Sequence, residues 1–491
     1  MTAPGAAQSV DWLAVAPVVT AAGTAVAVLL AGLWLPRRAV PGVVTAVGAG
    51  GVVAALAFVA LQWGERRATF CAGTSCSYVA DGVTLAFQGA VLVVSLVVLL
   101  LAHDSAPGLP AGETAVLVLA STTGALVLAA GRDLATVVVA LEVVTLPAIA
   151  LVGLRRRGRR DAEAALTFFV VSLVTLAVMI YGISLVYGAT GALHLDRIAA
   201  ALADPAARTP VATAGALLTL VGLFAKVGAV PFHFWVADAY AGGPVVVAAY
   251  LSVLPVAAAV VALAVVAGEG FAAYADVWGP VVAALAVATM TFGNVAALRQ
   301  RTAIRLLAWS SVAHAGYLLV PLGATATGFR GADVGEVLSA TVSYLCLYAV
   351  ANLTAFGVVA AASRAGAGVM LEQYRGLVRT QPLSAIALGF SLIALAGLPP
   401  GLVGLWAKIV LLDTAVAAGV GWLAVAVAVN VVIGLAYYLR WAAMLFSAAP
   451  GREPVPVFRM PLPSGFAVGL LLAAGVTLSV APELLLAPLA R

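Results

Sequence analysis

Long apolar stretches, separated by short polar connections, follow one another along the whole chain. A helix needs about 20 mainly apolar residues to cross the hydrocarbon core of a bilayer. We therefore predict a single polytopic, all-α membrane domain over residues 1–491. Its fourteen predicted spans cover residues 11–35, 40–63, 82–102, 113–130, 133–153, 161–187, 210–230, 240–267, 277–298, 303–323, 334–362, 383–411, 417–446 and 464–488.

The composition excludes other classes of protein. Apolar residues make up 64% of the 491 positions and charged residues 9%, whereas soluble chains average about 45–50% and about 25%. A disordered, fibrous or ordinary soluble protein is therefore excluded. We attribute the net charge of +5 to membrane topology rather than to a nucleic-acid surface.

Arginines divide unequally between the two sides that the spans define. With the N-terminus outside, sixteen arginines fall on the cytoplasmic side and seven on the outer side, as the positive-inside rule expects. We therefore expect both termini on the outer side. The loop with Cys71 and Cys76 then also lies outside, where a local disulfide and two free thiols are equally plausible.

Lysine has a different distribution from arginine. The chain has only two lysines, Lys226 and Lys408, and both lie within apolar spans. A charge at mid-membrane costs roughly 2.5–3.5 kcal/mol on insertion scales. Lysine can lose its proton when it is desolvated, whereas arginine stays charged. We therefore predict that both lysines are present because they can titrate.

The segments around the two lysines resemble each other. Residues 220–227 and 402–409 share six of eight positions, which favours an internal duplication, although an apolar chain can produce such a match by chance. Glycine and proline flank both segments. Proline removes a backbone donor and clashes with the preceding turn, so we predict broken helices, as in transporters built from repeats.

Glu142 is a carboxylate deep in the fifth predicted span. One interpretation is a carboxyl group satisfied by a neighbouring helix in a purely structural role. The other, which we favour, is one half of an ion pair with Lys226 that modulates the proton affinity of the lysine.

Two histidines are candidates for a proton relay. His233 follows Lys226 by seven residues, which is two turns or about 10 Å on a continuous helix, but it also fits an aromatic belt at the membrane interface. His314, in the tenth predicted span, could continue a relay or could simply bond to a neighbouring carbonyl. The sequence has no histidine–cysteine cluster for haem, iron–sulfur or zinc and no nucleotide fingerprint, so we expect no redox cofactor or metal site in this chain.

Several motifs resemble one known family over nearly the whole chain. They are residues 226–244, with Phe-His-Phe-Trp followed by Asp-Ala-Tyr-Ala-Gly-Gly-Pro, residues 294–316, Tyr374-Arg-Gly-Leu, residues 395–400 and Lys408. The chain resembles the antiporter-like membrane subunits of respiratory complex I, the bacterial NADH:quinone oxidoreductase, and among these the subunit N group.

The resemblance implies fourteen helices in two inverted five-helix repeats, spans 4–8 and 9–13, with helices 7 and 12 broken. The repeats would cover residues 112–268 and 277–447, between flanking helices in 11–102 and 464–488. It also implies proton translocation in the bacterial plasma membrane. The residues that the resemblance implies for the proton path are Glu142, Lys226, His233 and Lys408. We add His314 to this path as a candidate because of its own position in the tenth predicted span.

The resemblance also implies a set of partners. Partner subunits would bind NADH, FMN, iron–sulfur clusters and quinone, and would carry out electron transfer. Neighbours in the membrane would be the antiporter-like subunit M and the small subunits K and J.

This sequence departs from the family pattern at two positions. The family usually has a lysine in helix eight where this chain has Val256, and a basic residue where it has Ile304. Either water or a histidine such as His314 replaces that lysine, or the half-channels of this subunit are coupled in a different way. Two other functions therefore stay open: a subunit of a multisubunit cation/proton antiporter, and a structural subunit with a degenerate proton path.

Overall fold

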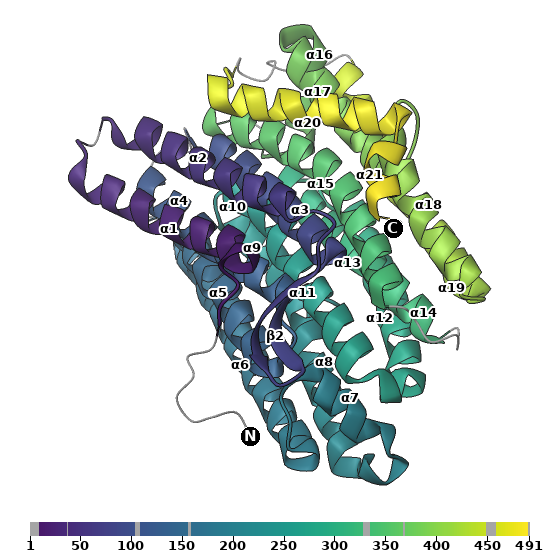
Figure 1. The fold of residues 1–491 in the computed structure, drawn as a ribbon. Coiled ribbons are helices and arrows are strands. Elements are labelled where there is room, and N and C mark those ends of the chain that lie inside the picture. Colours follow the sequence, from purple (N-terminus) through teal and green to yellow (C-terminus); the bar gives the residue numbers. More distant parts are fainter. Residues whose placement is uncertain are drawn as a thin grey trace.

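The computed structural model describes residues 9–36, 38–103, 109–155, 159–327, 334–366, 369–447 and 458–489. Within these ranges nearly all elements are helices, packed side by side along a common slant (Figure 1). Thirteen helical segments of the described residues are long and apolar enough to cross a membrane. The chain is thus a polytopic, mainly helical membrane protein, as predicted.

The helices of the first part of the chain begin where the sequence provides caps. Asp11, Asp81 and Asp133 accept hydrogen bonds from the first backbone amides of three of these helices, which satisfies donors that have no partner within the helix. The helices are α1 (Trp12–Trp34), α2 (Val40–Leu61), α3 (Gly82–Ala102), α4 (Ala111–Ala130), α5 (Leu134–Val152), α6 (Arg159–Thr190), α7 (Leu195–Ala203), η1 (Pro205–Ala207) and α8 (Pro210–Val227).

The central part of the chain is more interrupted than predicted. The span expected over residues 240–267 is divided, because Pro244 directly precedes one new helix and Pro255 lies in the first turn of the next, and proline cannot continue a preceding helix. The elements are α9 (Phe234–Gly242), α10 (Val245–Leu251), α11 (Leu254–Val265), the π-helical turn η2 (Val266–Gly270), η3 (Ala272–Tyr274), α12 (Ala275–Leu298), α13 (Ala303–Leu318), α14 (Val320–Thr327) and α15 (Val334–Arg364).

The last part of the chain contains the remaining predicted spans. Residues 383–411 form two helices of fifteen and sixteen residues, α17 (Pro382–Ala396) and α18 (Leu402–Ala417). The span expected over 464–488 is also divided, with α20 ending before Pro482. The other elements are η4 (Leu371–Tyr374), α16 (Leu377–Thr380), α19 (Gly421–Phe446), α20 (Leu462–Val480) and α21 (Glu483–Leu489).

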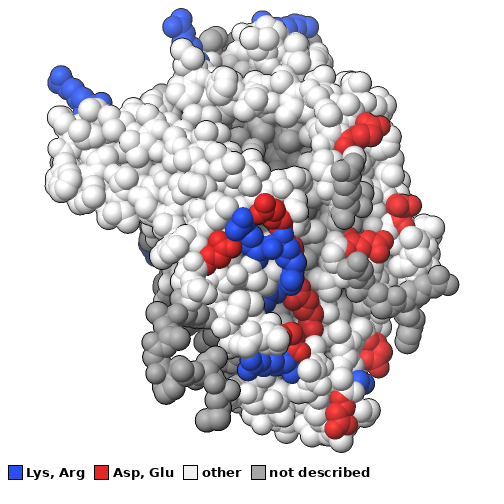
Figure 2. Space-filling model, viewed as in Figure 1, with Lys and Arg blue, Asp and Glu red and all other residues white. Residues whose placement is uncertain are grey.

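A two-stranded hairpin departs from the all-α prediction. Strands β1 (Arg67–Ala72) and β2 (Ser75–Ala80) pair antiparallel, with Cys71 opposite Cys76. These two cysteines form a disulfide, which decides between the alternatives that the sequence left open. Figure 2 shows charged side chains gathered around this region of the surface, while a broad white area lies over α1 and α2.

Two helices are broken where the glycines and prolines predict it. The helix α8 ends at Gly228 (φ 76°), and α9 begins only at Phe234. The helix α17 ends at Gly397 (φ 82°), and α18 begins at Leu402. Both glycines adopt the left-handed conformation that terminates helices and that side chains with a Cβ disfavour. The assignment of the two halves to inverted repeats stays a prediction.

Candidate functional site

Lys226 lies in the last turn of α8 and is 8% exposed. Its Nζ donates a hydrogen bond of 2.8 Å to Oε1 of Glu142 in α5 and forms an ion pair with it. Nζ also contacts the hydroxyl of Ser172 in α6 at 2.6 Å. A second hydroxyl, of Thr145, lies 3.4 Å away. The buried ammonium is thus paired with a charge and hydrogen-bonded, as burial of a charge requires.

The packing of α6 against α8 brings these groups together. Added Cβ atoms at Gly182 or Gly215 would lie less than 3 Å from the backbone of the opposite helix, so only glycine allows this separation. Downstream of the break, Nε1 of Trp235 donates to the carbonyl of Ala225 at 3.2 Å. This bond ties the start of α9 to the turn that holds Lys226.

A small cavity lies beside Lys226. Its volume is about 10 Å³, the size of the space that a single water needs. Thr145, Ser172 and Thr175 line it together with apolar side chains of α5 and α6, and Pro255 of α11 closes one side. The amine therefore faces a small internal space with three hydroxyl groups among mainly apolar side chains.

Lys408 has a different environment. It is 5% exposed, and its Nζ donates to the backbone carbonyls of Leu395 at 2.9 Å and Ala396 at 2.6 Å. These carbonyls belong to the last turn of α17, where they have no partner within the helix and carry its partial negative charge. Among the described residues Lys408 forms no ion pair. The break in the chain itself thus creates the acceptors for this amine.

His314 lies at the centre of a buried group of hydroxyls. Its Nδ1 is 2.6 Å from the hydroxyl of Tyr344, and its Nε2 is 3.1 Å from that of Tyr438. The ring stacks on Tyr348 at a centroid distance of 4.2 Å. Because both ring nitrogens have hydroxyl partners, a proton can enter and leave this imidazole at opposite sides.

A second group of hydroxyls lies at the joint between α10 and α11, and the ring of Tyr348, stacked on His314, adjoins the first group. The hydroxyl of Tyr348 is 3.2 Å from that of Ser311 and donates to the carbonyl of Ser252 at 3.4 Å. Asn352 donates to Oγ of Ser252 at 2.7 Å. Val256, in place of the family's lysine, is buried one turn further along α11.

His233 does not have the position that helical spacing predicts. The helix ends between Lys226 and His233, so the expectation of two continuous turns is wrong. The imidazole instead lies against Phe292 at 4.6 Å and Trp309 at 5.7 Å. In the described part of the chain no hydrogen bond joins it to Lys226. This position resembles the aromatic surroundings that were the alternative interpretation.

The structure joins only some of the candidate residues directly. Glu142 and Lys226 form a pair, whereas His314 and Lys408 each bond to other groups. The sequence analysis missed Ser172 and the tyrosines, because Ser, Thr and Tyr residues are frequent in these spans. The spacing of Tyr344 and Tyr348, one helical turn apart, is a sequence pattern that could have indicated a shared tyrosine face on this helix.

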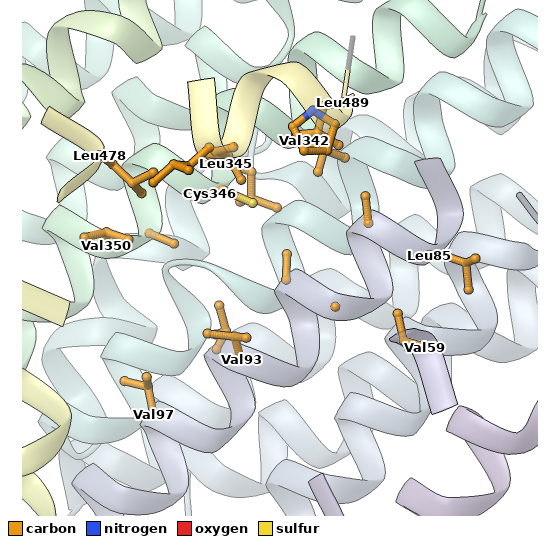
Figure 3. Close-up of a pocket in the computed structure, with 18 of the residues that line it drawn as sticks. Val59, Leu85, Val93, Val97, Val342, Leu345, Cys346, Val350, Leu478 and Leu489 are labelled. Atoms are coloured by element: carbon orange, nitrogen blue, oxygen red, sulfur yellow. The ribbon is translucent and has the colours of Figure 1, made fainter. Parts of the chain in front are cut away.

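An apolar groove elsewhere in the described part of the chain has no titratable group of this kind. It measures about 500 Å³ and lies between α3, α15, α20 and α21. Figure 3 shows aliphatic side chains such as Val93, Leu345 and Leu478 around it, with the sulfur of Cys346. Since none of its lining residues is charged, it is not part of the candidate proton site.

Comparisons with known proteins assign the chain to a family. The family model of NADH:quinone oxidoreductase/Mrp antiporter transmembrane proteins matches residues 131–434. A subunit of NADH-quinone oxidoreductase from Streptomyces griseus, named subunit N 2, is 50% identical over 99% of this chain and 94% of its own length.

Solved structures agree with this assignment. A chain of respiratory complex I from Thermus thermophilus superposes with a TM-score of 0.79 at 32% identity, covering 96% of this chain and 98% of that one. A chain of the Mrp complex from Dietzia has the same fold at 21% identity, with a TM-score of 0.79 over 97% of this chain and 96% of that one. The chain therefore belongs to the NADH:quinone oxidoreductase/Mrp antiporter family of membrane subunits, in the subunit N group.

Proposed function

We propose that this chain is the proton-translocating subunit N of an NADH:quinone oxidoreductase. The observation that supports this most directly is the ion pair of the buried Lys226 with the partly buried Glu142 at 2.8 Å, beside a break after α8 and a cavity of about one water. A buried titratable amine with an adjustable counter-ion is a suitable device for loading and releasing a proton.

The proposed cycle begins with Lys226 protonated and held by Glu142. Electron transfer in partner subunits moves the carboxylate away from the amine. In a low-dielectric interior the loss of this counter-ion strongly disfavours the charged ammonium, so Lys226 releases its proton to the adjoining cavity. Return of the carboxylate favours loading of the next proton.

The released proton then moves toward Lys408. The hydroxyls of Tyr348 and Ser311, together with His314 between Tyr344 and Tyr438, supply groups that can both accept and donate a proton. They would take the place of the lysine that is absent at Val256. His233 is also part of the proposed proton path. It lies after the break in the chain, against the rings of Phe292 and Trp309.

The proposal also covers the surroundings of the chain. Its neighbours are the antiporter-like subunit M and the small subunits K and J, and partner subunits hold NADH, FMN, iron–sulfur clusters and quinone. The chain resides in the bacterial plasma membrane with both termini on the outer side.

The test is coupled proton pumping by the assembled complex in membrane vesicles. Lys226→Ala and Glu142→Gln should each remove most of the pumping through this subunit, because each destroys the switchable ion pair. Glu113→Gln, which changes an exposed carboxylate in the first turn of α4, is the matched control and should pump normally. Normal pumping in an assembled Lys226→Ala complex would refute the role of the lysine.

The competing function is cation/proton exchange in an antiporter complex. We retain it because a chain of the Mrp complex has the same fold. There the same lysines would exchange protons for sodium without electron transfer. Affinity purification of this chain from native membranes distinguishes the two proposed functions. Flavin and iron–sulfur subunits in the purified assembly support the oxidoreductase, and their absence from an assembly with sodium-dependent proton flux supports the antiporter.

A further inference from the structure

A polar vestibule opens at the end of the molecule where α6 and α13 begin. Its volume is about 560 Å³, and its walls belong to α6, α9 and α13. Arg160 and Glu163 line it, together with Asp238 and Arg305, whose charged groups lie 3.6 Å apart. Their side chains are 58% and 52% exposed. The vestibule is therefore in contact with water.

The vestibule and the cavity at Lys226 lie in series along the same two helices. Arg160, Ala164 and Thr167 of α6 line the vestibule, and Phe168, Ser172 and Thr175 line the inner cavity. These positions recur every three or four residues and so share one face of the helix. On α9, the vestibule has Asp238 and Gly242, and the inner cavity has Trp235, again on one face.

Two aromatic rings occupy the level between the two spaces. Phe168 of α6 and Trp235 of α9 stack with their centroids 4.2 Å apart and their planes 2° from parallel. They are 4% and 2% exposed. The indole is held in place, because its Nε1 donates to the carbonyl of Ala225, the residue before Lys226.

We propose that the stacked pair of Phe168 and Trp235 is a barrier that separates the wet vestibule from the cavity at Lys226. This inference rests on the proposed function, for which it names the point of control. Two stacked apolar rings offer water no hydrogen-bond partner along the faces that they bury, so a continuous file of water cannot pass between them while they are stacked.

The break between α8 and α9 can control when the barrier opens. Because the indole is bonded to the turn that holds Lys226, a movement of that turn when Glu142 leaves the amine also moves Trp235. Opening of the stack can therefore be coupled to the charge state of the pair. Without such a barrier, Lys226 would stay in equilibrium with the vestibule, and pumped protons would return.

The barrier can be tested by the accessibility of a thiol behind it. A Thr175→Cys variant, in a chain with Cys346→Ala, places the thiol in the inner cavity. In inverted membrane vesicles containing the whole complex, a small membrane-impermeant methanethiosulfonate should label it slowly. Phe168→Ala should increase the labelling rate by about tenfold or more, because both the bulk of the ring and its stacking contact are lost.

Matched controls separate a barrier from a general loosening of the fold. Phe169→Ala removes the same side chain from the neighbouring position, which is 40% exposed, and should leave the labelling slow. Trp235→Phe keeps a ring in the stack and should increase the rate much less than Phe168→Ala. A Thr167→Cys thiol on the vestibule side should react quickly in every background.

Two results would overturn the proposal. One is an equal labelling rate of Thr175→Cys with Phe168 present and absent, and the other is equal acceleration by Phe168→Ala and Phe169→Ala. If Phe168→Ala does not assemble, Phe168→Leu provides the same comparison with a smaller change. Because labelling requires no pumping, normal pumping by Lys226→Ala would refute the proposed function while leaving this result interpretable.

Discussion

The two buried lysines, which have almost identical neighbours in sequence, are stabilised in different ways. Lys226 has a carboxylate and a hydroxyl within 2.8 Å, from two other helices. Among the residues that the structure describes, Lys408 has only two backbone carbonyls as partners, from the helix that precedes its own. The first amine is therefore held by a charge that can move away, and the second by dipoles fixed at a helix end.

The difference arises from where each lysine lies relative to the break. Lys226 precedes Gly228 by two residues, and Lys408 follows Gly397 by eleven. The two glycines are 169 residues apart, whereas the two lysines are 182 apart. The matching eight-residue segments therefore do not occupy corresponding positions in the two broken helices. Local similarity of sequence here does not mean similarity of environment.

The largest contrast should appear when each lysine is replaced by methionine. Lys226→Met leaves the carboxylate of Glu142 without its partner, and breaking a buried pair in this way costs about 3–5 kcal/mol. Lys408→Met leaves two carbonyls unbonded, at about 1–3 kcal/mol for each, but it also removes the desolvation penalty of a buried ammonium that has no carboxylate partner among the described residues, so its net loss should be smaller. Thermal unfolding of the purified complex in detergent measures both. Equal losses would contradict the comparison.

A double replacement tests whether the loss with Lys226→Met comes from the unpaired carboxylate of Glu142. In Glu142→Gln/Lys226→Met both charges are removed, so the complex should unfold at a higher temperature than with Lys226→Met alone. A double variant that is less stable than the single one would mean that Glu142 is not stabilised chiefly by the lysine.

An intermediate contrast concerns the two helix-ending glycines. Gly228→Ala and Gly397→Ala should each cost about 1–2 kcal/mol, because both residues have left-handed backbones that a Cβ disfavours. Only at Gly397 would the new Cβ approach a lysine, with Nζ of Lys408 at 2.9 Å; at Gly228 it would approach Val236 at 2.9 Å. Pumping should therefore fall further with Gly397→Ala, as measured in vesicles at matched assembly.

The smallest expected effect concerns the two tyrosine hydroxyls beside His314. Tyr344→Phe and Tyr438→Phe each remove one hydroxyl from His314, and a lost hydrogen bond costs about 1 kcal/mol. Tyr274→Phe is the control, since its buried hydroxyl has no partner among the described residues. Pumping rates should fall with the first two and stay unchanged with the control. Unchanged rates throughout would remove His314 from the proposed path.

Much of the architecture could be predicted from the sequence. Long apolar stretches have few alternatives to membrane helices, because every backbone polar group in lipid must be bonded within the segment. Glycine and proline close to Lys226 and Lys408 likewise identified both breaks. The hairpin was missed, since residues 67–80 are short strands that depend on pairing with each other and on the Cys71–Cys76 disulfide.

The sequence by itself thus determined the membrane class, the breaks and the rarity of lysine, because these depend on composition and on local backbone chemistry. Only the tertiary structure decided that Lys226 meets a carboxylate 84 residues away while Lys408 meets the end of the preceding helix. It also placed His233 among aromatic rings and His314 among tyrosines. Partners on different helices are set by packing, which no local pattern encodes.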